Sequence, residues 1–257
     1  MCVNRGATTT VTATRGQGRV TVRLNGCPSE APVTTTVARS MVEAGRTDLD
    51  IDTCLGLPAS SGFGMSAAGA LSTAFALAEI LGRPREEAFA AAHRAELANR
   101  TGLGDVPALT AGGLTFRRRE GLPPFGQIDR LADELELVSA VVGPAMPTST
   151  VLGDPGRRAR IEEVGRECYQ ALCHHPTKAD FFRLSREFAY RSGLATPHVK
   201  AAVEAVDGLG EASMVMLGNA VFAAGEIEQI EELLTVFGPT YRLSLDTLGP
   251  RVLAVEE

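Results

Sequence analysis

The stretch from Pro58 to Ser66 most constrains this chain, because paired serines and spaced glycines there lead straight into an apolar run. The apolar run predicts a helix over residues 66–81 that begins at the end of a tight loop. Unpaired N–H groups and the positive dipole end of such a helix bind phosphate. Gly62 and Gly64 let the backbone approach an anion, because neither has a Cβ. The loop also offers three hydroxyl groups for phosphate or a metal ion: Ser60, Ser61 and Ser66.

An ordinary capped helix after a glycine-rich turn is the alternative interpretation of this loop, since short glycine motifs often occur by chance. The loop matches neither of two common nucleotide-binding motifs, the Walker A loop and the Rossmann fingerprint. A Walker A loop ends in Gly-Lys-Ser or Gly-Lys-Thr, whereas the only lysines of the chain are Lys178 and Lys200. A Rossmann fingerprint needs a third glycine, and Ala67 stands at that position. A nucleotide bound here would need the helix end, a divalent cation and arginines to offset its charge.

The charge balance argues against a general nucleic-acid binder. The net charge is −6 and the pI is about 5.4, whereas such proteins usually carry a basic patch. The one dense basic run, residues 117–119, is interpreted as a solvated strand end. Composition is that of a globular protein, with 44% hydrophobic and 22% charged residues. No nucleic-acid partner is therefore expected.

A cytoplasmic location and no membrane partner are expected. No apolar run approaches the roughly 18–20 residues that span a bilayer, and the N-terminus contains no apolar signal core. The five cysteines are odd in number and scattered, so they predict no disulfide framework.

The secondary-structure pattern predicts an α+β fold in two domains, residues 1–145 with the phosphate-binding loop and residues 146–257. Strands are predicted in two pieces within 8–24, and at 49–55, 135–142, 241–245 and 251–255, with another ending near 117. Helices are predicted at 66–81, 85–98, 155–175, 179–191, 197–206 and 226–236. Residues 33–42 fit either a strand end or the start of a helix.

Three oxygen-bearing side chains are candidates for the chemistry of a bound nucleotide. Ser66 can supply a hydroxyl and Glu96 a carboxylate to magnesium, which takes few ligands from protein and shares others with phosphates. Asp105, at the end of a second glycine loop, could accept a proton from an attacking hydroxyl or orient it. Taken singly, Glu96 also fits a solvated helix acid and Asp105 an Asx-turn residue.

Residues 58–68, with the sequence PASSGFGMSAA, resemble the phosphate-binding motif of the GHMP kinases, the superfamily of galactokinase, homoserine kinase, mevalonate kinase and phosphomevalonate kinase. That motif is usually a proline, a spacer and Gly-Leu-Gly-Ser-Ser-Ala-Ala, from which Phe63 and Met65 depart. Within the superfamily the chain is most similar to archaeal pantoate kinases. That resemblance depends on three sequence motifs: 62–72 (GFGMSAAGALS), 92–96 (AHRAE) followed by 101–106 (TGLGDV), and 216–222 (MLGNAVF).

The resemblance implies a two-domain GHMP-kinase-like fold with the ATP site between the domains. The implied reaction is phosphorylation of the primary hydroxyl of pantoate by ATP, giving 4-phosphopantoate for coenzyme A biosynthesis. Whether the protein forms a homodimer stays open. It further implies that Ser66 and Glu96 hold Mg²⁺ and that Asp105 is the catalytic residue. The residues implied to contact the ATP phosphates are Pro58, Ser60, Ser61, Gly62, Phe63, Gly64, Met65, Ser66, Ala67 and Ala68.

Two departures from the family pattern affect this interpretation. Residues 214–222 stand where the superfamily has a third, glycine-rich motif, but they are poor in glycine, and Asn219 is the polar candidate there. A buried apolar strand and turn is the alternative interpretation of this segment, on its content of Met, Val and Leu. Family members also have a strand and a first motif before the region that matches Cys2 onward, so the N-terminal edge is expected to be shortened.

Several alternatives stay open from the residues alone. The substrate could be homoserine, mevalonate or a sugar, or the chain could be a non-catalytic descendant that binds a ligand. A pantoate carboxylate would need a bidentate arginine, for which Arg100 and Arg191 are candidates. His93 lies one helical turn from Glu96, where it could orient that carboxylate.

Overall fold

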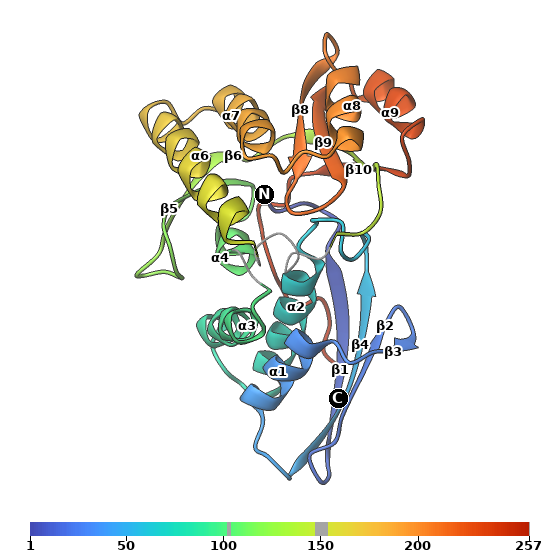
Figure 1. Ribbon diagram of the computed structural model, residues 1–257. Coiled ribbons are helices and arrows are strands. Elements are labelled where there is room, and N and C mark those ends of the chain that lie inside the picture. The colour runs from blue at the N-terminus through green and yellow to red at the C-terminus, as the bar shows by residue number, and fades with distance from the viewer. Residues whose placement is uncertain (102–103, 147–153, 257) are drawn as a thin grey trace. The chain divides into compact units, whose positions relative to one another are not determined.

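The computed structural model describes residues 1–101, 104–146 and 154–256 (Figure 1). The chain forms two compact units, and neither is continuous in sequence. Unit 1 contains Met1–Pro58, Gly64–Arg130 and Asp246–Glu257, and unit 2 contains Ala59–Phe63 and Leu131–Leu245. The domain boundary predicted at residue 145 therefore falls inside unit 2.

Unit 1 is built on a four-stranded mixed sheet in the order β1-β4-β2-β3. The central strand β4 (Thr47–Leu55) runs antiparallel to β1 (Ala7–Arg15) and parallel to β2 (Val20–Leu24), and the short β3 (Cys27–Pro28) closes the other edge. The predicted strands at 8–24 and 49–55 are confirmed. Sequence neighbours β1 and β2 do not pair with each other, because β4 lies between them.

Helices α1 (Pro32–Met41) and α2 (Met65–Ile80) pack on one face of this sheet, and α3 (Arg85–Asn99) packs against these two helices (Figure 1). The ambiguous segment 33–42 is thus helical. Leu49 and Ile51 of β4 are buried against the helices, whereas the alternate positions of that strand are more exposed, as the two-residue period of a strand requires. Helix α2 is apolar on nearly every side and buried along most of its length, as the apolar run predicts.

Residues 105–132 and the C-terminal segment differ from the sequence prediction in three places. The seven-residue helix α4 (Asp105–Ala111) and the strand β6 (Gln127–Ala132), which pairs with β5 (Leu114–Arg119), were not predicted. The strand predicted at 251–255 is wrong, because those residues are exposed and pair with no strand among the described parts of the chain. Valines and leucine give the segment strand propensity, but propensity forms no strand without a sheet edge to join.

Unit 2 is built on an antiparallel sheet in the order β10-β7-β9-β8. Its strands are β7 (Glu136–Val141), β8 (Gly210–Val215), β9 (Ala220–Gly225) and β10 (Thr240–Ser244). Its helices are α6 (Pro155–His174), α7 (Lys178–Arg191), α8 (Pro197–Ala205) and α9 (Ile227–Thr235), which confirm the four helices predicted there.

Both faces of the unit 2 sheet are buried. On one face, Met214 and Val221 share a core with apolar residues of α8 and α9. On the other, Phe222 of β9 packs against Phe181 and Phe182 of α7, with ring centroids 6.4 and 5.3 Å away. Over the described residues, no helix is both long and apolar enough to cross a membrane.

Candidate active site

The N-terminus of α2 is open, as the glycine loop predicts. Gly64 is the N-cap residue with a left-handed φ of 66°, and no side chain caps the helix. Ala68 N–H makes the first intrahelical bond, to Gly64 O at 3.0 Å. A helix start without a side-chain cap presents backbone N–H groups that an anion can accept from.

Asp105 lies directly beside this helix start. A Cβ built on Gly64 would stand 3.5 Å from both the carboxyl carbon and one carboxylate oxygen of Asp105. Asp105 is the first residue of α4, and its N-cap Gly104 has a φ of 112° that favours glycine. Residues 102 and 103 of the second glycine loop lie outside the described residues. The structure thus brings together the loop glycine and the acid that the sequence analysis selected separately.

Glu96 is the second acid, and it is buried. On α3 it is only 2% exposed, and no described residue donates a hydrogen bond to its carboxylate. Burial, and secondarily the negative charge of Asp105, raise the pKa of Glu96 to about 7. Glu96 is therefore a buried acid near a second carboxylate, not the solvated helix acid of the alternative interpretation.

Asp105 itself stays accessible to solvent. Protein atoms crowded around its carboxyl raise its pKa, an effect that the N-terminal ammonium and the Arg117 guanidinium oppose. The two acids thus differ in setting, one enclosed and the other at an open position.

The residues fit a divalent cation. Glu96 offers a buried carboxylate whose ionised form a cation would stabilise, and Ser66, exposed in the first turn of α2, offers a hydroxyl to which the described residues make no hydrogen bond. Within the described chain, no group of three or more His, Cys, Asp or Glu side chains could hold a metal alone. A cation here would therefore need to share ligands with a bound phosphate, as Mg²⁺ commonly does.

Arg117 is a site residue that the sequence analysis missed. A Cβ built on Gly104 would stand 1.4 Å from Arg117 Nη1, so the guanidinium lies over the N-cap of α4. Its positive charge opposes the raised pKa of Asp105 and contributes, after burial, to the lowered pKa of His93. The interpretation of residues 117–119 as a solvated strand end is wrong for Arg117, which is half-buried.

Nothing in the spacing of the basic run distinguishes Arg117 from its neighbour. Arg118, also half-buried, pairs with Asp129 at 2.6 Å and stands 4.7 Å over the ring of Phe116. Strand alternation predicts that Arg117 and Arg118 point to opposite faces of β5. Only the folded chain shows which of the two faces meets Asp105.

The two arginines proposed from the sequence for a substrate carboxylate are placed differently. Arg191, in unit 2, is bonded to Glu167 and to Glu187, the latter at 2.7 Å. Arg100, in unit 1, is the exposed C-cap residue of α3 with a left-handed φ of 55°. Arg191 is therefore engaged in a surface ion-pair network, and Arg117 is an arginine whose charge does act on Asp105.

The first half of the loop, Ala59–Phe63, packs within unit 2. A Cβ on Gly62 would meet Val215 O at 2.6 Å, and a Cβ on Gly218 would meet Ser61 O at 2.1 Å. The missing Cβ of Gly62 therefore also serves packing, since the chain's own β8–β9 turn occupies the space that a Cβ would need. Phe63 adds an edge-to-face contact with Tyr241 of β10, with centroids 6.2 Å apart.

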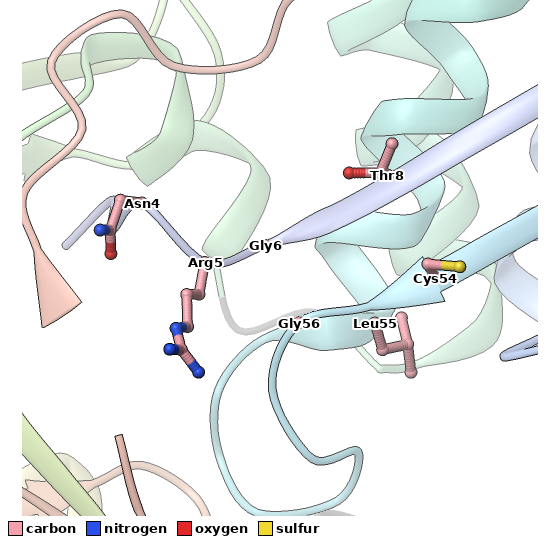
Figure 2. Close-up of a pocket in the computed structure, with 7 residues that line it drawn as sticks. All are labelled: Asn4, Arg5, Gly6, Thr8, Cys54, Leu55 and Gly56. Atoms are coloured by element: carbon pink, nitrogen blue, oxygen red, sulfur yellow. The ribbon is translucent and has the colours of Figure 1, made fainter. Parts of the chain in front are cut away.

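A shallow hollow of about 340 Å³ lies beside the end of β4. Figure 2 shows Thr8 and Cys54 on neighbouring strands and Arg5 projecting from the chain just before β1. The hollow is close in sequence to the phosphate loop but contains none of the predicted site residues. The residues that line it are Asn4, Arg5, Gly6, Thr8, Cys54, Leu55 and Gly56.

Comparison with known proteins agrees with this geometry. The family model "GHMP kinases N terminal domain" matches residues 33–113, which include α2, Glu96 and Asp105. The chain is 33% identical to the pantoate kinase of Methanospirillum hungatei over 89% of this chain and 76% of that protein. It is 32% identical to the pantoate kinase of Thermococcus kodakarensis, over 90% of this chain and 80% of that protein.

A solved structure described as a phosphotransferase related to the coenzyme A biosynthesis pathway superposes with a TM-score of 0.85 at 29% identity. The superposition covers 95% of this chain and 85% of that one. The similarity therefore extends over both units and is not restricted to the loop motif.

Proposed function

Because the chain belongs to the pantoate kinases of the GHMP kinase family, we propose that it transfers the terminal phosphoryl group of ATP to the primary hydroxyl of pantoate. The product would be 4-phosphopantoate, an intermediate for coenzyme A biosynthesis. The observation that carries this proposal is the position of Asp105 against Gly64, which puts a carboxylate next to an uncapped helix N-terminus.

The loop and helix are proposed to bind the ATP phosphates through backbone N–H groups, with the helix dipole offsetting negative charge. Phe63 and Met65, which depart from the usual motif, contribute their backbones to this loop and do not alter that role. The residues proposed to line the phosphate site are Pro58, Ser60, Ser61, Gly62, Phe63, Gly64, Met65, Ser66, Ala67 and Ala68. Pro58 has no N–H to donate, and the Ala68 N–H is engaged within the helix, so the donors would come from the other residues.

Asp105 is proposed to orient the attacking hydroxyl of pantoate and to accept its proton. Protein atoms crowded around the carboxyl raise the pKa of Asp105 above its ordinary value, and a more basic carboxylate is a better proton acceptor. The Arg117 guanidinium lies over Gly104, the residue before Asp105. Arg117 is proposed to offset the negative charge of the substrates beside Asp105.

Ser66 and Glu96 are proposed as the protein ligands of Mg²⁺, which supplies charge neutralisation of the nucleotide phosphates when bound. The support is the buried Glu96 carboxylate, to which the described chain provides no hydrogen-bond donor. Most of the rate enhancement would come from positioning and electrostatic stabilisation, as in phosphoryl transfer generally.

The test is release of ADP from Mg²⁺ and ATP in the presence of pantoate, homoserine, mevalonate or galactose, each supplied separately. We expect ADP with pantoate alone, and a new phosphomonoester on its primary hydroxyl by ³¹P NMR. ADP formed with one of the other alcohols, or with none of the four, would contradict the proposal.

A further inference from the structure

The first half of the phosphate loop is supported from two directions, and Asn219 connects both supports. One support is the β8–β9 turn, in which Gly218 packs its backbone directly on Ser61. The other is the segment after β7, in which Met146 N–H donates to Ser60 O at 3.0 Å. Asn219 follows Gly218 in the chain and is only 7% exposed.

Both ends of the Asn219 side chain are engaged. Its Nδ2 donates to Pro144 O at 2.8 Å, and its Oδ1 accepts from Thr196 Oγ1 at 2.8 Å. Its backbone carbonyl also accepts from Val142 N–H at 2.8 Å. The two side-chain bonds, here called the Asn219 clamp, tie the β8–β9 turn to the segment that holds Ser60 and to the start of α8.

Thr196 gives the clamp a fixed outer end. It is the N-cap residue of α8, and its Oγ1 also accepts from Val199 N–H at 3.4 Å. Because the same hydroxyl caps the helix and donates to Asn219, its rotamer is restricted from both sides. All residues of the clamp and residues 59–63 belong to unit 2.

We infer that Asn219 and Thr196 are positioning residues for the phosphate loop, which fix the conformation of Ala59–Phe63 without touching either substrate. This inference rests on the proposed function of the loop. It assigns the glycine-poor segment 214–222 a support role, since both polar ends of the Asn219 side chain are already hydrogen-bonded within the protein. Small displacements of a binding loop reduce turnover strongly, so such residues affect catalysis from outside the reacting groups.

The variants Asn219→Ala and Thr196→Val remove the clamp, and Thr196→Ser keeps the hydroxyl. Ser139→Ala is the matched control, since it removes another buried side-chain bond of the same sheet, from Ser139 Oγ to Val221 O at 2.6 Å, but leaves the loop supports in place. We expect kcat/KM for ATP to fall about 10- to 100-fold in the first two variants. KM for pantoate should change less than twofold, and Thr196→Ser should recover most of the activity.

Hydrogen–deuterium exchange of the 59–63 peptide gives a readout that does not depend on activity. Faster exchange is expected in Asn219→Ala and Thr196→Val, but not in Ser139→Ala of comparable thermal stability. The inference is wrong if the two clamp variants lose as much stability as Ser139→Ala but keep the wild-type exchange rate of residues 59–63 and the wild-type kcat/KM for ATP. If wild-type protein forms no ADP with pantoate, the proposed function fails instead, and loop exchange alone still decides on the clamp.

Discussion

The two halves of the phosphate loop, Ala59–Phe63 and Gly64–Ala68, are adjacent in sequence, yet they are held by different forces. Ala59–Phe63 is fixed by backbone packing and hydrogen bonds in unit 2, and Gly62 faces a carbonyl of the β8–β9 turn. Gly64–Ala68 begins a helix in unit 1, and Gly64 faces the carboxyl of Asp105. One glycine therefore serves packing and the other serves access to a charged group, although the motif presents them as a pair.

The largest effect is expected from the charged half. Asp105→Asn should reduce kcat by about 10²- to 10⁴-fold, because the proposed proton acceptor is lost. The melting temperature should not fall, since the protein environment already disfavours the ionised form of Asp105. The measurement is ADP release at saturating substrates together with thermal unfolding, and exposed Glu120→Gln is the control. If Asp105→Asn kept the wild-type kcat, the charged half of the loop would have no catalytic role through Asp105.

The buried carboxyl of Glu96 should make the free energy of unfolding depend on pH. Its folded-state pKa of about 7 exceeds the ordinary value of 4.5, so the folded protein holds this proton more tightly than the unfolded chain. Stability attributable to Glu96 is then greatest below pH 4.5, declines as the pH rises to about 7, and is level above that. At about 1.4 kcal/mol per pKa unit, the decline is roughly 3 kcal/mol.

Urea unfolding across this pH range would measure the decline, and Glu96→Gln should abolish it. Glu86→Gln, an exposed substitution in the first turn of the same helix, should leave the wild-type profile intact. Identical profiles for wild type and Glu96→Gln would mean that burial does not govern the ionisation of this acid.

In the packed half, Gly62→Ala should act mainly on stability. The new Cβ would stand 2.6 Å from Val215 O and would require a φ of 92°, so we expect a loss of about 1–3 kcal/mol in the free energy of unfolding. Urea denaturation measures it. Gly165→Ala in α6, where the nearest atom is a ring carbon of Phe188 at 3.3 Å, is the control and should cost less.

Gly64→Ala should have the smallest effect on stability. Its Cβ would make ordinary contacts at 3.5 Å with Asp105, so only the left-handed φ of 66° is strained, at about 1 kcal/mol. Because the added methyl group touches the Asp105 carboxyl, kcat should fall more than in Gly62→Ala when each is corrected for the folded fraction. The reverse order of the two kcat values would contradict the division of the loop into a packed and a charged half.

Local patterns predicted the parts of this site that depend on local forces. The apolar run identified α2 to within one residue at each end, and the glycine spacing identified the turn before it. The residue types also selected Glu96 and Asp105, which the fold places within electrostatic range of each other. Such features follow from hydrophobic periodicity and backbone freedom, which act over a few residues.

The missed features all depend on contacts between distant parts of the chain. Helix α4 has only seven residues with a proline among them, so its pattern is too short to identify. The neighbour of Gly62 is Val215, and no property of the loop specifies that contact. Arg117 likewise reaches Asp105 only because β5 places it there, whereas its sequence context is a run of similar arginines.

The route of the chain between the two units has a consequence for engineering. The polypeptide passes between them after Pro58, Phe63, Arg130 and Leu245, so a five-residue piece of unit 2 is inserted within unit 1. A gene fragment encoding residues 131–245 would therefore lack Ala59–Phe63, the peptide that packs against the β8–β9 turn. Splitting this protein into independently expressed halves, or exchanging one half with a relative, would require that short peptide to be supplied with the second half.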